Sequence, residues 1–140
     1  MEIFSIGYEK RRIVEFCASL KEAGVEALVD VRERAWSNRP EYRKQALKRA
    51  LATVGIDYIH LKEAGNPYRP RKGEVLDVEK CRRAYSEHLR QNRGILEKAW
   101  ELAQARPSAF FCYESITSHC HRGVLLTRLR RRHGARLVHL

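Results

Sequence analysis

The segment 108–134 constrains this chain more than any other part of its sequence. It begins with a short apolar run, Ala109–Tyr113, which predicts a buried strand. Apolar residues then recur at helical spacing over Val124–Leu129, so a helix is expected to follow. Between the two lies a cluster of polar and nucleophilic residues, His119, Cys120, His121, Arg122 and Gly123. The sequence therefore predicts a thiol at the junction between a strand and a helix N-terminus.

Such a junction favours anions. Free backbone N–H groups and the positive end of the helix dipole attract negative charge, and the dipole together with Arg122 favours the Cys120 thiolate. We expect the N–H groups around Cys120, His121 and Arg122, together with Arg32, to bind phosphate, sulfate or a nucleotide phosphate. The alternative is that Ser118 caps the helix and Arg122 pairs with Glu114, which leaves no free donors.

The whole chain alternates between strand and helix patterns. Strands are predicted at 2–8, 25–31, 56–61, 109–113 and 135–140. Helices are predicted at 11–23 and 41–54, and after Asp77 with a break at Gly94. The last is the helix over Val124–Leu129 described above. Alternation of this kind predicts one α/β domain over residues 1–140, with a mainly parallel five-stranded sheet and helices on both faces.

Composition places the protein among soluble domains. No apolar run is long enough to span a bilayer, and the first residues do not resemble a signal peptide, so a cytoplasmic location is expected. The four cysteines show no C-x-x-C spacing, which favours free thiols in a reducing compartment. No metal or other cofactor is expected.

The formal net charge of +11 predicts attraction to polyanions. The expected partner is a phosphate-bearing small molecule or nucleic acid rather than a membrane, and the oligomeric state is open. Arginines outnumber lysines in the last helix, which favours phosphate contacts. A basic surface that serves only solubility is the alternative.

Ligands of open parallel sheets bind beyond the carboxyl ends of the strands. The catalytic residues expected there are Cys120, Glu114 and Asp30. The expected substrate-binding residues are Arg32, Arg122, His121, Tyr8, Gly7, His60 and Cys112. Several of these residues have a purely structural role as the alternative. Asp30 and Arg32 would form a buried ion pair, His60 would lie at the edge of the core, Glu114 would cap backbone N–H groups, and Cys112 would point into the core.

Three chemistries fit this cluster. The first is a Cys120 thiolate nucleophile acting on a phosphate-bearing or nucleotide substrate. A tyrosine-phosphatase mechanism is disfavoured, because the position six residues after Cys120 is Leu126 and not arginine. The second is sulfur transfer through a persulfide on Cys120. The third is a metal site made by Cys112, His119, Cys120 and His121.

We favour an enzyme, but two other classes of function remain open. One is a non-catalytic nucleic-acid-binding module that uses the basic helices. The other is a structural or partner-binding protein whose polar rim is only a hydrogen-bonded network. Two further expectations concern the surroundings of the site. Asp30 and Arg32 should share a network with Glu114 or Arg122, and the loop 62–76 should border the site and be the most mobile internal segment.

Motifs along nearly the whole chain carry a family likeness. These are SIGY near the N-terminus, VDVR, IDYIHL followed by GNP, and CYE followed by CHR. In this combination the chain resembles the domain of unknown function 488 family, compact α/β domains of bacteria and archaea without an established activity. The resemblance implies a shared site made of Asp30, Arg32, Cys112, Glu114, Cys120, His121 and Arg122. The chain departs from the family pattern at Trp36 and at Gly65-Asn66, which affects the loops more than the core of the site.

Overall fold

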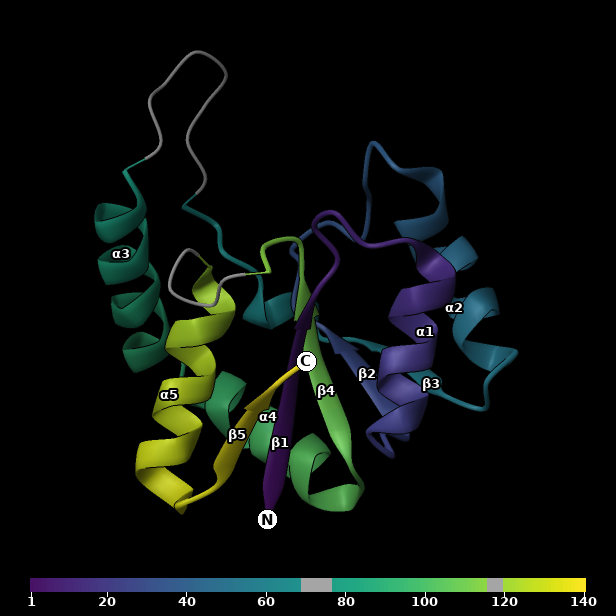
Figure 1. Ribbon diagram of the computed structural model, residues 1–140. Coiled ribbons are helices and arrows are strands. Elements are labelled where there is room, and N and C mark those ends of the chain that lie inside the picture. Colours follow the sequence, from purple (N-terminus) through teal and green to yellow (C-terminus); the bar gives the residue numbers. More distant parts are fainter. Residues whose placement is uncertain (69–76, 116–119) are drawn as a thin grey trace.

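The five strands form one parallel sheet. The computed structural model describes residues 1–68, 77–115 and 120–140 (Figure 1). The strands are β1 (Glu2–Gly7), β2 (Ala27–Asp30), β3 (Asp57–His60), β4 (Ser108–Cys112) and β5 (Arg136–His139). Their order in the sheet is β3-β2-β4-β1-β5, and every neighbouring pair is parallel. The predicted α/β class and five-stranded parallel sheet are confirmed.

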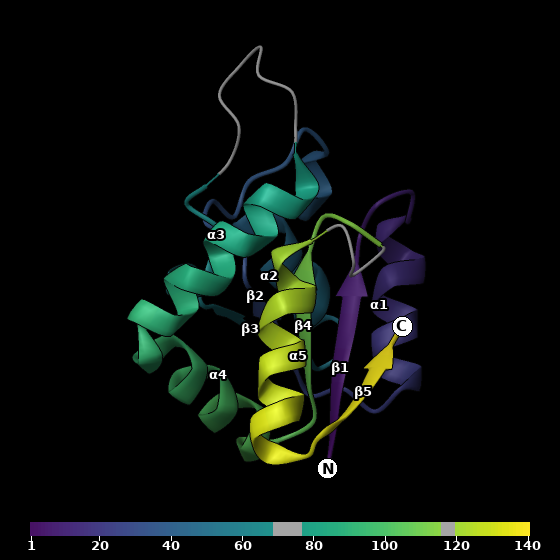
Figure 2. The same ribbon diagram turned by 90° about the vertical axis from the view of Figure 1, so that its left-hand side faces the viewer.

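Helices cover both faces of this sheet. They are α1 (Ile13–Glu22), α2 (Lys44–Ala52), α3 (Val78–Gln91), α4 (Arg93–Ala105) and α5 (His121–His133), with short 3₁₀ turns at η1 (Pro40–Tyr42) and η2 (Lys62–Ala64). Helices α1 and α2 pack on one face, and α3, α4 and α5 pack on the other (Figures 1 and 2). Asp77 caps α3 as expected, whereas the break before α4 falls at Asn92 rather than at Gly94. Within the described ranges, no helix is long and apolar enough to cross a bilayer.

Alternation along the strands decides which face each side chain reaches. In β4, Phe110 and Cys112 join the core under α3–α5, while Phe111 joins the core under α1 and α2. In β2, Leu28 belongs to the α1–α2 side, and Asp30 lies two residues further along the same strand. The Asp30 and Cys112 side chains therefore lie on opposite faces of the sheet.

The carboxyl ends of the strands meet at one edge, as predicted. Gly7 pairs with Cys112, and Asp30 pairs with both His60 and Phe111. Glu114 follows β4 by two residues. The expectation that Gly7, Asp30, His60 and Glu114 lie near the same edge is confirmed.

Gly7 allows the chain after β4 to cross the end of β1. A Cβ atom at Gly7 would overlap the backbone carbonyl of Glu114 and lie 2.8 Å from the Cα of Ser115. This close approach of the Glu114–Ser115 backbone is what requires glycine at position 7. Gly7→Ala should therefore lower the free energy of unfolding by about 1–3 kcal/mol, because backbone must move to admit the methyl group.

Gly94 offers a matched control for this change. It lies in α4, and a Cβ atom there would have no neighbour within 4 Å. Gly94→Ala should leave stability unchanged or raise it by about 0.5–1 kcal/mol, because alanine favours the helix. Urea denaturation of the two variants checks the prediction, and equal stabilities would contradict it.

Candidate functional site

A cavity of about 610 Å³ opens at the carboxyl edge of the sheet. Six of the ten residues expected in the site line it: Tyr8, Arg32, Cys112, Glu114, Cys120 and His121. The other four, Gly7, Asp30, His60 and Arg122, are not among its lining residues. The structure thus brings the expected cysteines, the carboxylate and one histidine to a common cavity.

Two cysteines meet in this cavity. The Sγ atoms of Cys112 and Cys120 are joined in a disulfide, and both side chains are buried. The prediction that all four cysteines are free thiols is wrong, because it considered only sequence spacing, whereas Cys112 ends β4 and Cys120 is the N-cap of α5. Cys17 and Cys81 are free.

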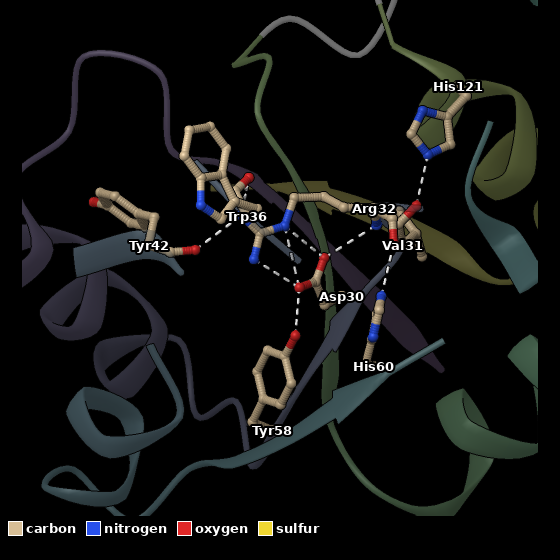
Figure 3. A network of polar contacts seen from close by, with 8 residues as sticks. All are labelled: Asp30, Val31, Arg32, Trp36, Tyr42, Tyr58, His60 and His121. Carbon is tan, nitrogen blue, oxygen red and sulfur yellow. Dashed lines mark hydrogen bonds and ion pairs between the residues drawn. The ribbon is translucent and has the colours of Figure 1, made fainter. Parts of the chain in front are cut away.

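Cys120 has a histidine as its immediate neighbour. Cys120 is the N-cap residue of α5, and its Sγ atom accepts the Arg122 N–H at 3.4 Å and lies 3.7 Å from Nδ1 of His121. Nε2 of the same ring lies 2.8 Å from the Val31 carbonyl oxygen (Figure 3). A carbonyl oxygen only accepts, so Nε2 carries a hydrogen and Nδ1 of the neutral ring keeps a lone pair. The geometry presents a proton acceptor to the Cys120 sulfur.

Cys112 has a different pair of neighbours. Its sulfur lies 3.4 Å from Oε2 of Glu114 and accepts from Nη1 of Arg122 at 3.3 Å. Arg122 also donates to the carbonyl oxygens of Ile6 at 2.6 Å and Glu114 at 2.9 Å. Its side chain is fully buried, and burial lowers the pKa of Arg122 to about 10. The guanidinium therefore ties β1 to the segment after β4 and places positive charge beside Cys112.

The same side chains form a possible metal donor set. One ligand atom from each of Cys112, Glu114 and Cys120 lies within 4.8 Å of the others. Thiolates with a carboxylate are ligands that zinc accepts once the disulfide is reduced. His119 of the predicted metal set and Ser118, the predicted cap, lie outside the described residues, and the cap of α5 is Cys120 itself.

The Asp30–Arg32 ion pair lies on the other face of the sheet. Arg32 Nε donates to Oδ1 of Asp30 at 2.9 Å, and its Nη2 donates to Oδ2 at 2.8 Å (Figure 3). Both residues are buried. The third member of the network is Tyr58, whose hydroxyl donates to Oδ2 at 2.5 Å. The predicted pair is confirmed, but Glu114 and Arg122 make their contacts elsewhere because strand alternation points Asp30 away from them.

Backbone contacts fix the segment that follows β2. Arg32 Nη1 donates to the Tyr42 carbonyl at 2.9 Å, and Nε2 of His60 lies 2.8 Å from the Arg32 carbonyl (Figure 3). Burial lowers the pKa of Arg32, but the hydrogen bond and the charge of Asp30 outweigh it and raise that pKa overall. Burial and the Asp30 charge together raise the pKa of Tyr58. Asp30, Arg32 and His60 therefore act here as supports for the cavity wall.

Tyr42 makes the stability of the fold depend on pH. Its side chain is fully buried, and burial raises its pKa to about 12. The folded state thus holds the phenolic proton above pH 10, where the unfolded chain releases it, so stability is complete below pH 10 and falls between about pH 10 and 12. Urea denaturation from pH 9 to 11 should show this decline in the free energy of unfolding. Tyr42→Phe should make the free energy of unfolding fall less steeply with pH. A Tyr42→Phe slope equal to that of the wild type would contradict the assignment.

Apart from the loop that contains Tyr68, the sequence did not indicate the rim of the cavity. Three exposed aromatic side chains line it, Trp36, Tyr68 and Tyr113, together with three arginines, Arg34, Arg39 and Arg82. Arg34 is exposed and makes no hydrogen bond or ion pair with the described part of the chain. These residues come from loops and from α3, so only the general excess of arginine could have pointed to them.

The loop expected to border the site does so in part. Asn66 and Tyr68 line the cavity, and Tyr68 is anchored to α3, because its carbonyl lies 3.3 Å from the Cys81 sulfur. The remainder of the loop, 69–76, lies outside the described residues, and so does the expectation of its mobility.

Comparison with known proteins identifies the family. No curated protein matches the chain. Among solved structures, a provisionally assigned phosphatase (DUF442) from Shewanella putrefaciens CN-32 aligns with a TM-score of 0.46 and 12% identity. The alignment covers 95% of this chain and 64% of that chain, less than two thirds of the other protein. This likeness is too low to support an argument about activity. The family model described as "Domain of unknown function DUF488" matches residues 12–129, and the chain therefore belongs to that family.

Proposed function

We propose that the protein is an enzyme in which the Cys120 thiolate attacks a phosphate-bearing substrate, most simply a nucleotide. The observation that carries this proposal is the orientation of His121, whose Nε2 bonds the Val31 carbonyl while Nδ1 faces the Cys120 sulfur. His121 accepts the thiol proton, and the helix dipole of α5 stabilises the thiolate. The sulfur forms a bond to phosphorus, the bond from phosphorus to the leaving oxygen breaks, and that oxygen departs with the electron pair and takes up the proton held by His121. Water then attacks phosphorus, loses a proton to His121 and releases the Cys120 thiolate.

The phosphate of the substrate needs a cation that the protein itself does not use. Arg32 and Arg122 are both buried and hydrogen-bonded to protein groups, so their roles in this proposal are to position the wall and the strand ends. Arg34 is exposed on the cavity wall without a partner among the described residues. We therefore assign the phosphate contact to Arg34 rather than to Arg122.

Protection of Cys120 from alkylation tests the proposal. In reduced protein, AMP or pyrophosphate at millimolar concentration should slow the reaction of Cys120 with iodoacetamide, as resolved by peptide mass spectrometry. Arg34→Gln should weaken this protection about tenfold or more, because it removes a charge-assisted contact. Arg49→Gln, the same change at an exposed position of α2, serves as the matched control. Equal alkylation rates with and without both ligands would overturn the phosphate-bearing substrate.

The disulfide favours a second candidate, sulfur chemistry at the same cysteine. A sulfur atom carried on Cys120 as a mixed disulfide or persulfide can be displaced by the Cys112 thiolate. That attack forms the Cys112–Cys120 bond and expels the sulfur-bearing group with its electron pair, and an external dithiol then reduces the pair. Glu114 and Arg122 beside Cys112 suit this resolving role. Cys112→Ser separates the two candidates. The phosphate candidate predicts that a nucleotide still protects Cys120 in this variant, whereas the sulfur candidate predicts that mixed disulfides are trapped on Cys120.

A further inference from the structure

A groove lined by arginines runs between α3 and α5. The two helices lie side by side on the same face of the sheet (Figures 1 and 2), and the groove between them has a volume of about 1030 Å³. Five arginines line it: Arg82, Arg83, Arg128, Arg131 and Arg132. Glu79 is its one acidic lining residue within the described part of the chain. The groove is therefore strongly positive.

This positive charge is largely uncompensated. Arg83, Arg131 and Arg132 are exposed and take part in no hydrogen bond or ion pair with the residues that the structure describes. The dipole of α5 accounts for cations in its last turn, where Arg131 and Arg132 lie. A helix dipole does not account for Arg83, which lies in the N-terminal half of α3, far from the last turn of that helix. A bound polyanion would account for both sets.

The groove leads directly to the thiol cavity. Arg82 and Val78 line both, and Nη1 of Arg82 donates to the carbonyl oxygen of Cys120 at 2.8 Å. A chain of phosphates held along α3 and α5 would thus reach the N-terminus of α5 without leaving positive surface.

Aromatic side chains are concentrated at the mouth of the cavity. The exposed aromatic residues of the described chain are Trp36, Tyr68 and Tyr113, with 55%, 44% and 46% of their surfaces accessible, and all three line this cavity. Arg43 covers one side of the Trp36 ring at 4.8 Å, and Tyr113 meets Tyr8 edge to face. Exposed aromatic faces next to a basic groove are the features by which proteins hold unpaired bases.

From these observations we propose that the α3–α5 groove binds single-stranded nucleic acid and delivers one of its nucleotides to the thiol cavity. The delivery step rests on the proposed function, whereas binding in the groove does not. A single strand fits better than a duplex, because only unpaired bases offer their faces to Trp36 and Tyr113. A lipid surface would use the arginines but not aromatic side chains inside a cavity.

Fluorescence anisotropy with labelled 12-nucleotide DNA and RNA single strands tests the groove. Binding should weaken linearly in log affinity against log salt concentration. Arg131→Gln with Arg132→Gln should reduce affinity about tenfold or more and lower the salt slope by roughly 1.4, the value for two phosphate contacts on a single strand. Lys48→Gln with Arg49→Gln removes the same charge from exposed positions of α2 and should have little effect.

Other outcomes overturn the proposal. Equal losses in the two double variants would mean non-specific attraction to net charge. Equal affinity for duplex and single strand, or no loss with Trp36→Ala, would exclude base stacking, and binding to anionic phosphatidylserine vesicles without oligonucleotide binding would indicate a membrane. The proposed function is judged separately: if AMP protects Cys120 but the oligonucleotide does not bind, the groove proposal fails and the nucleotide proposal stands.

Discussion

Asp30→Ala is expected to lower the free energy of unfolding by about 3–5 kcal/mol, the cost of leaving a buried charge without its partner. Arg32 would keep its hydrogen bond to the Tyr42 carbonyl, but its Nε and Nη2 would lose their Asp30 acceptors at a buried position. Tyr58 would lose the acceptor of its hydroxyl as well. Urea denaturation at neutral pH measures the effect.

Two further variants separate the ion pair from general disruption. Glu41→Ala removes a partly exposed partner of Arg39 and should cost less than about 1 kcal/mol. Asp30→Ala combined with Arg32→Met should recover part of the loss, because no unpaired charge remains. A stability of Asp30→Ala within 1 kcal/mol of wild type, or no recovery in the double variant, would contradict the network.

Much of the fold could be predicted because its signals are local. Apolar runs gave the strands, helical spacing gave the helices, and their alternation gave a parallel sheet whose carboxyl ends share an edge. Cys112, Glu114, Cys120 and His121 were brought to one cavity by that reasoning alone. The order of the strands could not be derived, because it depends on packing between segments far apart in the chain.

Asp30 and Cys120 were expected to act in one site because both follow from the same edge of the sheet. A shared edge does not place two side chains on the same face. Two residues at neighbouring strand ends can lie on opposite faces, and the register of β2 with β4 sets Asp30 beside Phe111 rather than Cys112. The disulfide was missed for a related reason, because the eight-residue separation of its cysteines says nothing about how a loop returns. The cavity rim depends on Arg82 from α3 and on loop aromatics, which no local pattern connects to the site.

The reactivity that we expect of Cys120 follows from its neighbouring histidine. In reduced protein, the lone pair of His121 Nδ1 and the dipole of α5 both favour loss of the thiol proton. Cys81 provides an internal reference, since it is a partly exposed free cysteine that lines the same cavity. Cys120 should therefore be alkylated about tenfold faster than Cys81 near pH 7, despite its deeper burial.

His121→Gln is the variant that isolates this effect. A glutamine amide can still donate to the Val31 carbonyl, so the wall is retained, but no basic nitrogen faces the sulfur. The change should slow Cys120 alkylation at pH 7 by about 10- to 100-fold. The Cys81 rate in the same sample should not change.

The central claim is that His121 favours the thiolate form of Cys120. The pH dependence of Cys120 alkylation, compared between reduced wild type and His121→Gln, tests it most directly. Peptide mass spectrometry resolves the Cys120 reaction from that of Cys81. The account predicts that the wild-type rate reaches half its maximum at least about one pH unit below that of Cys81, and that His121→Gln moves the curve back towards Cys81. Superimposable curves for Cys120 in the two proteins, or a Cys120 curve that matches Cys81 in the wild type, would contradict it.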